Sequence, residues 1–309
     1  MDTWPNFFIV GAPKAGTTSL HAQLQSVPGI FMSRIKEPNY FSRTLVPDEH
    51  QLRPIRDSQK YLRLFDGVTS ENIIGEASPT YLADPDAPRL IHEVAPQARI
   101  LISLRDPVER AFSHYLMMRN NGTARLPFLG EIQRGLKLAG DRHLVLLRPE
   151  IGLYHDQVAR YVATFGWSQV RVILFEELGA DTAAVLRGVL DFLGVNGSVT
   201  ISGTEEHRKF GEARGPWVRL LFANRTIARL SEILVSPRLR KFVRERFLVR
   251  SVAKPVMDPD ARDFLIEYYR EDVQKLAALL GLPLPWRNFV ASGATAPVGP
   301  AQPDPSPGA

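Results

Sequence analysis

Two glycines and a lysine directly after the first apolar run (residues 7–10) have the spacing of a phosphate-binding turn. Gly11 and Gly16 are separated as in G-x-x-x-x-G-K-[ST], but Thr17 stands where that motif has its lysine, and Lys14 lies two residues before the second glycine. A strand-to-helix turn of this kind exposes backbone N–H groups at the start of a helix, where they favour an anion. The pattern predicts a phosphate site unlike a nucleoside triphosphatase loop; the alternative is an ordinary glycine turn with a solvated lysine.

A second candidate anion site follows the apolar run at residues 99–104. Asp106 suits the N-cap of a helix and Pro107 its first position, so a helix is predicted to begin here. Arg105 would then stand at the carboxyl end of a central strand, where open α/β sheets bind ligands, with Ser113 two turns into the helix. Either these two residues bind a second phosphate, or Arg105 pairs with a neighbouring acid and Ser113 is a buried helix serine. Together the two turns suggest a nucleotide with two separated phosphate groups.

These turns need a sheet whose strands end side by side. Short apolar runs with β-branched residues alternate with longer stretches at helical spacing, which is typical of a mainly parallel sheet with crossover helices. The predicted strands are residues 7–10, 73–74, 99–104 and 170–175. The predicted helices are one after the first turn, with Leu20, Leu24 and Val27 on one face, and those at residues 58–65, 107–119, 154–165, 182–193 and 259–280. The fold class is therefore α/β, with a central sheet flanked by helices.

The composition is that of a globular protein and excludes several chemistries. The chain has 309 residues, 44% of them hydrophobic, and no cysteine. Disulfide scaffolds, cysteine-ligated zinc, iron–sulfur clusters and thiol nucleophiles are thereby excluded. One domain is expected over residues 1–290, followed by a disordered tail at 291–309 that holds five of the 24 prolines. No apolar run reaches the ~20 residues of a membrane span, and the amino terminus lacks a basic leader, so a cytoplasmic location is expected.

Positive charge is concentrated in one late segment. The formal net charge is +5, yet residues 208–254 hold 13 Lys and Arg against three acids. From residue 217 to 252 the basic and apolar residues are interleaved. This segment either lies on an anionic membrane, receives an acidic glycan or lipid acceptor, or forms helices with a solvated basic face. Nucleic-acid binding is not expected, because no recognised nucleic-acid module accompanies the charge.

The two turns together resemble the sulfotransferases that use 3′-phosphoadenosine 5′-phosphosulfate (PAPS). Residues 13–20 (PKAGTTSL) are similar to the 5′-phosphosulfate loop of that family, and residues 104–115 (LRDPVERAFSHY) to its 3′-phosphate motif. Further similarity is found at residues 36–41, 75–81, 152–157, 191–194 and 268–270 and at Trp286. The resemblance is closest to the glycan-type (heparan-sulfate-like) and bacterial branch. It implies a single P-loop-like domain that transfers a sulfuryl group to a hydroxyl or amine of a carbohydrate, lipid-linked glycan or small molecule.

The resemblance also implies roles for individual residues. Lys14 would contact the oxygen that bridges phosphate and sulfate, and Arg105 and Ser113 would bind the 3′-phosphate. In-line sulfuryl transfer builds charge on the leaving oxygen, and a lysine can stabilise that charge, so no metal is required. The 5′-phosphate would be held by the loop residues Ala15, Gly16, Thr17, Thr18 and Ser19.

A general base is also needed, since the acceptor hydroxyl or amine must lose a proton. By the resemblance, Glu37 occupies the position of the catalytic carboxylate in the glycan-type enzymes. Pro38 biases Glu37 toward extended backbone, in a loop near the cleft. The alternative for Glu37 is a solvated loop residue. His114 adjoins Ser113 on the predicted helix, where adjacent residues do not share a face, and is interpreted as structural.

The late basic loop departs from the animal enzymes of the family. Those enzymes carry a cysteine pair there, whereas the corresponding residues 207–215 lack cysteine and offer Lys209 and Arg214 as candidate phosphate contacts. The animal enzymes are also membrane anchored, so a soluble bacterial-type enzyme fits this chain better. Two other functions stay open: an atypical P-loop kinase that depends on magnesium and ATP, and a nucleotide- or glycan-binding module without catalysis.

Overall fold

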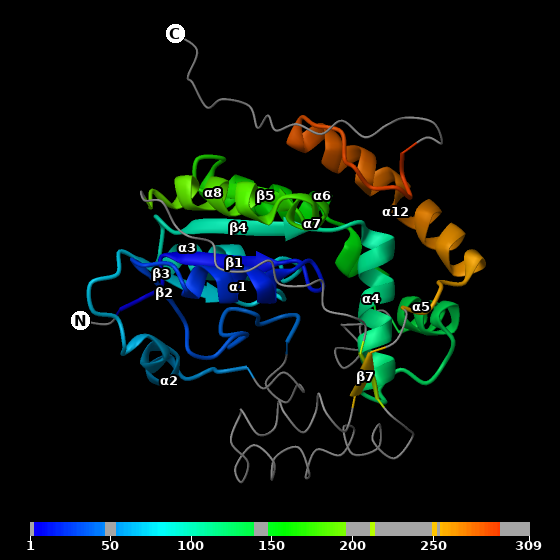
Figure 1. Ribbon diagram of the computed structural model, residues 1–309, viewed down its shortest axis with the longest axis horizontal. Coiled ribbons are helices and arrows are strands. Elements are labelled where there is room, and N and C mark those ends of the chain that lie inside the picture. Colours follow the sequence, from blue (N-terminus) through cyan, green and yellow to red (C-terminus); the bar gives the residue numbers. More distant parts are fainter. Residues whose placement is uncertain are drawn as a thin grey trace.

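A five-stranded parallel sheet forms the centre of the molecule (Figure 1). The structure, a computed structural model, describes residues 3–46, 54–138, 148–195, 211–213, 249–251 and 254–290. The strands are β1 (Phe7–Gly11), β2 (Ile30–Met32), β3 (Ile73–Ala77), β4 (Arg99–Leu104) and β5 (Val170–Leu174), in the order β2-β3-β1-β4-β5. The next two strands along the chain, β2 and β3, lie on one side of β1, and the later strands β4 and β5 lie on its other side. The carboxyl ends of β1 and β4 therefore flank the crevice at which such sheets bind ligands.

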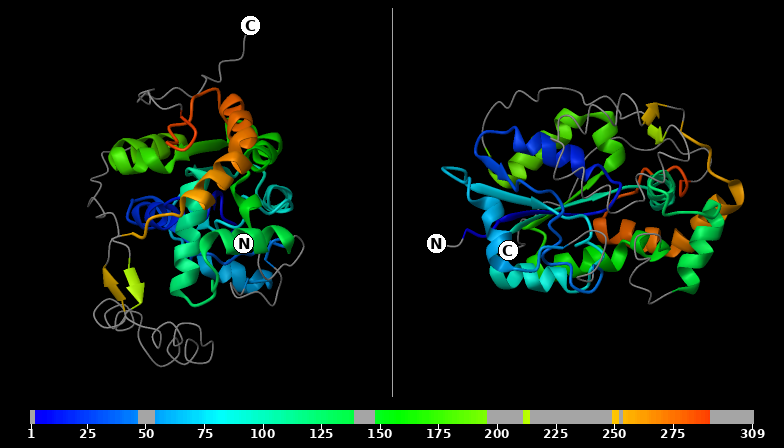
Figure 2. Two further views of the ribbon diagram at one scale, coloured as in Figure 1. Left: turned by 90° about the vertical axis from the view of Figure 1, so that its right-hand side faces the viewer. Right: turned by 90° about the horizontal axis from the view of Figure 1, so that it is seen from below.

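Helices cover both faces of this sheet (Figure 2). They are α1 (Thr17–Gln25), α2 (Ser58–Leu62), α3 (Ala87–Val94), α4 (Pro107–Asn120), α5 (Phe128–Lys137), α6 (His155–Phe165), α7 (Phe175–Ala180), α8 (Thr182–Leu193) and α12 (Pro259–Leu280), with 3₁₀ turns η1 (Arg63–Phe65) and η3 (Pro149–Gly152). Helices α1, α7 and α8 pack on the face that carries Phe7 and Ile9. Helices α3, α4, α6 and α12 pack on the face that carries Phe8 and Val10. Because both faces are covered, every residue of β1 is buried.

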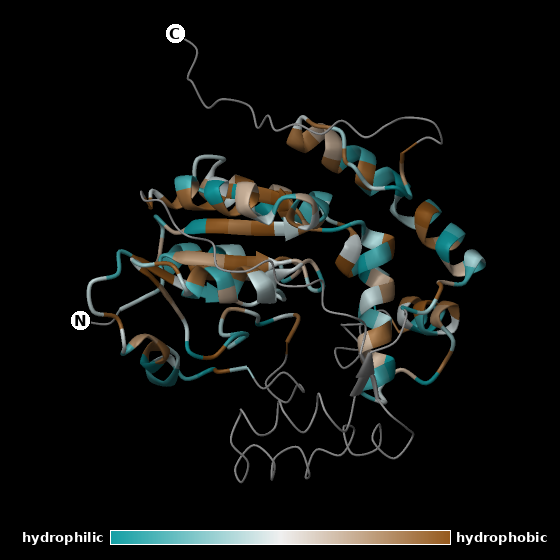
Figure 3. Cartoon of the chain, viewed as in Figure 1, coloured by the Kyte–Doolittle hydropathy of each residue, from teal (hydrophilic) through white to brown (hydrophobic). Residues whose placement is uncertain are grey.

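Hydropathy follows this layered arrangement (Figure 3). The central strands β1 and β4 are mostly hydrophobic, whereas the helices carry hydrophobic and hydrophilic residues on different sides. None of the helices in the described ranges combines the length and the apolar character that a bilayer-spanning segment requires.

The predicted fold class is confirmed, and each predicted strand and helix is present with small differences in its bounds. The helix predicted at 58–65 divides into α2 and the 3₁₀ turn η1, and α1 ends at Gln25, before Val27. The strand β2 and the helices α3, α5 and α7 were not predicted. Phe175 was predicted at the end of a strand, whereas this residue begins α7. The chain turns into a helix there because the Glu177 carboxylate accepts a hydrogen bond of 3.2 Å from the backbone N–H of Leu174. A strand of three residues such as β2 is too short to give a periodic signal.

Several predictions fall on parts of the chain outside the described residues. These are the phosphate contacts Lys209 and Arg214, the basic segment 217–252 except for residues 249–251, and the tail at 291–309. Two short strands of this part of the chain are described and pair antiparallel: β6 (Gly211–Ala213) and β7 (Val249–Ser251).

Candidate active site

The turn after β1 is fastened to the neighbouring strand β4 and leaves the start of α1 open. The backbone N–H of Ala12 donates to the carbonyl of Ser103 (2.6 Å), and the hydroxyl of Ser103 donates to the carbonyl of Ala15 (2.6 Å). Gly16 precedes α1 with φ 82° and offers no side-chain cap. A Cβ atom on Gly16 would lie 3.1 Å from the ring of Phe175. The first N–H groups of α1 are thus presented in the cradle that a phosphate group requires.

Lys14 reaches from this turn toward α4. It is half-buried with φ 71°, and its Nζ lies 3.7 Å from Sδ of Met117. Burial lowers the pKa of Lys14, the charge of Arg105 lowers it further, and the charge of Glu37 acts in the opposite direction. Within the described residues Lys14 makes no ion pair. A partly buried cation without a carboxylate partner is stabilised by a bound anion, so this side chain fits a phosphosulfate group.

Arg105 stands directly after β4 and next to the lysine turn. Its Nη1 donates to the carbonyl of Lys14 (3.2 Å), and its guanidinium lies 4.5 Å from the ring centroid of Phe175. Burial lowers its pKa, and the carboxylates of Glu109 and Glu176 partly oppose that change. In the part of the chain that the structure describes, Arg105 pairs with no acid. The structure therefore does not support the alternative that Arg105 pairs with a neighbouring acid. Its guanidinium is free to bind a second anion.

The start of α4 has the predicted cap and two partners that were not predicted. The carboxylate of Asp106 accepts from the backbone N–H groups of Val108 (2.9 Å) and Glu109 (3.3 Å). Its other oxygen accepts from Nδ2 of Asn288 (2.8 Å), and its backbone N–H donates to Glu176 (3.1 Å). These contacts from α7 and from the end of the described chain fix the direction of the strand-to-helix turn that carries Arg105.

Ser113 and His114 are neighbours on α4 and differ in burial. Ser113 is half-buried and lies four residues before Met117, the residue that Lys14 contacts. His114 is buried, and neither of its ring nitrogens has a hydrogen-bond partner among the described residues. Burial and the charges of Arg110 and Lys14 hold the pKa of His114 well below its usual range, which makes it a poor proton acceptor at neutral pH. Its structural interpretation agrees with this environment.

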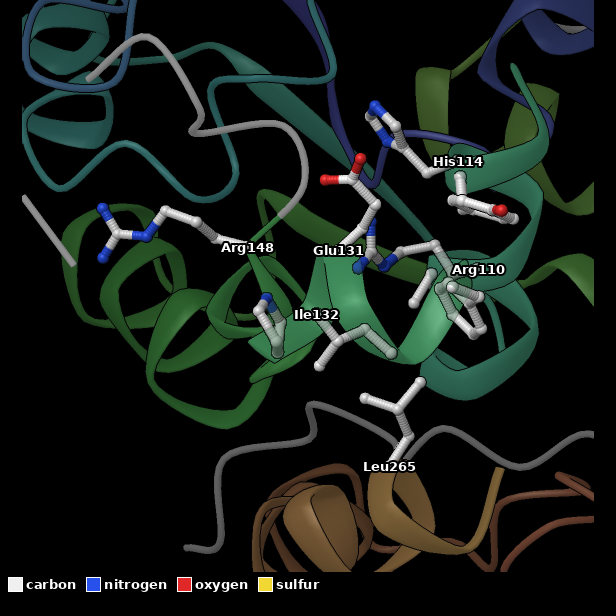
Figure 4. A pocket seen from close by; sticks show the side chains of 10 residues that line it. Arg110, His114, Glu131, Ile132, Arg148 and Leu265 are labelled. Carbon is white, nitrogen blue, oxygen red and sulfur yellow. The ribbon is translucent and has the colours of Figure 1, made fainter. Parts of the chain in front are cut away.

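A small hollow lies beside His114, on the side of α4 that packs against α5 and α12 (Figure 4). Arg110 and Glu131 line it together with Arg148 and Leu265. Neither Ser113 nor any residue of the turn at residues 11–16 lines this hollow.

Glu37 lies in the loop after β2, close enough to Lys14 for their charges to interact. The predicted extended backbone is wrong, because Glu37 has φ 63°, in the left-handed region. Its N–H donates to the carbonyl of Ala77 at the end of β3 (2.9 Å), and its carbonyl accepts from Nδ2 of Asn39 (2.8 Å). These tertiary contacts override the local bias from the following proline. The Glu37 carboxylate is 39% exposed and pairs with Lys36, so it can meet an acceptor from solvent.

The structure adds contact residues that the sequence analysis did not identify. Met117 touches Lys14 and Phe175 stacks on Arg105. The helical spacing from Ser113 was the only signal for Met117, and nothing local marks Phe175. Among the described residues, no three His, Asp or Glu side chains come together to hold a metal ion.

Comparison with known proteins gives matches along most of the chain. Residues 5–278 match the family described as sulfotransferase domain. The bifunctional heparan sulfate N-deacetylase/N-sulfotransferase 4 of Mus musculus is 29% identical over 294 residues, which cover 92% of this chain and 31% of that protein. The solved structure of a sulfotransferase from Alicyclobacillus acidocaldarius is 32% identical with a TM-score of 0.70, covering 92% of this chain and 99% of that chain.

A mouse sulfotransferase solved in complex with PAP shares the fold, at 16% identity and a TM-score of 0.52 over 88% of this chain and 85% of that chain. The present chain spans about a third of the length of the heparan sulfate relatives that it matches. The family match nevertheless covers the whole central sheet and both candidate anion sites. The chain belongs to the sulfotransferase family.

Proposed function

We propose that this protein transfers a sulfuryl group from PAPS to a hydroxyl or amine of an acceptor. One observation carries the proposal. Lys14 and Arg105 meet at the crevice between β1 and β4 beside the open start of α1, and neither cation has a carboxylate partner among the described residues. Two adjacent anion sites of this kind match a nucleotide with phosphate at both the 5′ and the 3′ position.

The chain's own residues divide the work of transfer. PAPS supplies the activated sulfuryl group when it is bound. The N–H groups at the start of α1, with Thr17, Thr18 and Ser19, would hold the 5′-phosphate. Arg105 and Ser113 would hold the 3′-phosphate. Lys14 would stabilise the negative charge that develops on the leaving oxygen, because its ammonium is already positioned and partly desolvated.

Glu37 would accept the proton of the acceptor. Its carboxylate is accessible, it lies near Lys14, and the pairing with Lys36 orients it. A general base must reach the proton that it removes, and a half-exposed carboxylate beside the transfer site meets this condition. Glu37 is thus the residue on which turnover depends most.

The acceptor is proposed to be a glycan, with an amine or a hydroxyl as the reacting group. The similarity to a heparan sulfate N-sulfotransferase supports an amino sugar, although the match covers only part of that protein. A lipid-linked glycan or an acidic lipid is the other proposed class, since residues 217–252 are rich in basic and apolar side chains. Contact of this segment with an anionic membrane and a cytoplasmic location stay predictions.

The proposal is tested first by cofactor binding. Isothermal titration with 3′-phosphoadenosine 5′-phosphate (PAP), with and without magnesium, should give metal-free binding that Lys14→Ala and Arg105→Ala both weaken. Arg187→Ala, which removes an exposed arginine from α8, is the matched control and should bind like the wild type. Binding of ATP that requires magnesium, in place of PAP, would favour a kinase and contradict the proposal.

Turnover is tested with PAPS that carries radiolabelled sulfate. N-deacetylated heparosan offers free amines and hydroxyls, and N-acetylated heparosan offers hydroxyls only. Label on the first polymer alone would identify an amine acceptor, and label on both would identify a hydroxyl. A protein that binds PAP but transfers label to neither polymer, nor to lipid-linked glycan or small-molecule acceptors, would be a binding module without catalysis.

A further inference from the structure

A fully buried carboxylate, Glu76, lies beneath the loop that carries Glu37. It is 0% exposed, near the end of β3. Its carboxylate accepts three hydroxyl hydrogen bonds: from Ser78 (2.5 Å), from Tyr61 (2.6 Å) and from Tyr81 (3.2 Å). An ionised carboxylate has acceptors only, so three O–H donors converging on it form a consistent arrangement.

Two of these hydroxyls also accept a hydrogen bond from the Glu37 loop. The backbone N–H of Asn39 donates to Oγ of Ser78 (3.1 Å), and the backbone N–H of Phe41 donates to the hydroxyl of Tyr81 (3.2 Å). A hydroxyl has a single proton. Since each of these hydroxyls gives its proton to Glu76, its lone pairs are turned toward the loop. The buried carboxylate therefore keeps both hydroxyls oriented to accept from the loop.

One of the two amides held in this way belongs to a residue with strained backbone. Glu37 has φ 63° and Asn39 has φ 52°, and non-glycine residues keep such angles only when their surroundings determine them. The side chain of Asn39 adds a direct connection, because its Nδ2 donates to the carbonyl of Glu37 (2.8 Å) and its Oδ1 accepts from Thr80 (2.7 Å). The position of Glu37 thus depends on Asn39, and Asn39 depends on Ser78 and Glu76.

We propose that Glu76 is a positioning residue for Glu37, which it holds through Ser78 and Tyr81. The inference rests on the proposed function, in which Glu37 accepts the proton of the acceptor. Glu76 itself is buried among aromatic side chains and cannot meet a substrate. Its influence on the reaction passes through the loop backbone.

The arrangement depends on the ionisation of Glu76. Burial raises the pKa of Glu76 to about 7, while the hydrogen bonds from Ser78, Tyr61 and Tyr81 act in the opposite direction. The groups that face it are these three hydroxyls and Tyr161 of α6, whose own pKa the Glu76 charge raises. Protonation would turn one acceptor oxygen into a donor, so one of the three hydroxyls would have to turn away.

Hydrogen exchange measured on the full chain with PAP bound tests the connection directly. In Glu76→Gln an amide nitrogen replaces one acceptor oxygen, so the amides of Asn39 and Phe41 should exchange at least about 10-fold faster. Ser78→Ala should affect mainly Asn39, and Tyr81→Phe mainly Phe41. Tyr61→Phe is the matched control, because it removes a donor to the same carboxylate but no bond to the loop. Unchanged exchange at both amides in Glu76→Gln would overturn the proposal.

The second measurement is turnover with PAPS and N-deacetylated heparosan as the probe acceptor. Displacement of a reacting group by about 1 Å costs about 100-fold in rate, so kcat of Glu76→Gln should fall roughly 10- to 100-fold while KM for PAPS changes less than about two-fold. Tyr61→Phe should keep kcat within about three-fold. Loss of amide protection without loss of kcat would also overturn the positioning role.

The two proposals can fail separately. If Glu37→Gln keeps the turnover of the wild type, the assignment of the base fails, and if no acceptor is sulfated, the proposed function fails. In both cases the exchange of the Asn39 and Phe41 amides still reports whether Glu76 holds the loop. If Glu76→Gln does not fold, Ser78→Ala and Tyr81→Phe test the same two hydrogen bonds individually, with the thermal unfolding midpoint as the check on folding.

Discussion

The turn at residues 11–16 (the cofactor turn) and the loop at residues 36–41 (the Glu37 loop) lie close together but are stabilised in different ways. The turn is held by regular structure: it joins β1 to α1, its backbone is bonded to β4, and the anion donors are N–H groups that every helix start offers. The Glu37 loop has no regular structure and is held by side chains from β3 and the segment after it. The first region can be recognised from local sequence, whereas the second exists only through tertiary contacts.

The two regions also differ in charge. Lys14 and Arg105 are cations without a carboxylate partner in the described part of the chain, and burial lowers the pKa of both. Glu37 by contrast already pairs with Lys36. Loss of Lys14 or Arg105 should therefore change the affinity for the cofactor, and loss of the Glu37 carboxylate should change turnover alone. Four variants test this difference.

The largest effect is expected for Glu37→Gln. The variant keeps the shape of the side chain but cannot accept a proton, so kcat should fall by roughly 10²- to 10⁴-fold, the usual contribution of a general base. The affinity for PAP, measured by isothermal titration, should stay within about two-fold. Unchanged kcat would reassign the base, and a parallel loss of PAP affinity would contradict the separation between the two regions.

Arg105→Ala is expected to weaken PAP binding by about 2 to 4 kcal/mol, which corresponds to roughly 30- to 900-fold in Kd. The guanidinium is half-buried and would make charge-assisted bonds to the 3′-phosphate. Arg187→Ala is the control for loss of one positive charge. Equal Kd values of the two variants for PAP would show that Arg105 does not contact PAP.

Glu76→Gln should flatten the dependence of stability on pH. The pKa of Glu76 is about 7 in the folded protein, against the ordinary value of 4.5. The folded protein thus binds more protons than the unfolded chain between these values, and this residue's contribution to stability is present below pH 4.5 and is lost as the pH rises through 7. The expected loss is about 3 kcal/mol. Urea unfolding at pH 5 and pH 8 measures the free energy of unfolding of both proteins. An equal loss of this free energy between the two pH values in wild type and variant would contradict the prediction.

Gly16→Ala should have the smallest effect on stability, about 1 to 2 kcal/mol, because alanine is strained in the left-handed region. Gly29→Ala is the matched control. Both glycines have φ near 80° (82° and 83°), but a Cβ on Gly29 meets nothing within 4 Å, whereas one on Gly16 approaches Phe175. Thermal unfolding should show a loss for both variants, and PAP affinity should fall only for Gly16→Ala. Loss of affinity in Gly29→Ala would mean that the effect is not local to the cradle.

Much of the fold and of the cofactor turn was determined by the sequence itself. The glycine spacing before α1, and Asp106 and Pro107 before α4, specify two strand-to-helix turns from residues that are neighbours in the chain. The apolar runs of β1 and β4 specify buried strands, and parallel strands of one sheet end at the same edge. Local capping and periodicity are sufficient for these features, because each depends on residues within one or two turns of one another.

Only the tertiary structure decided how Glu37 is presented. Its left-handed φ, opposite to the local expectation, follows from bonds to Ala77 and Asn39, and the hold of Glu76 on the loop joins residues some forty positions apart. Phe175 reaches Arg105 in the same way, from a distant strand end. Such contacts carry no short-range pattern, since they depend on which segments the folded sheet brings together. The sequence therefore predicted where a nucleotide would bind, and the packing of distant segments decided how the proposed base, Glu37, is held beside that site.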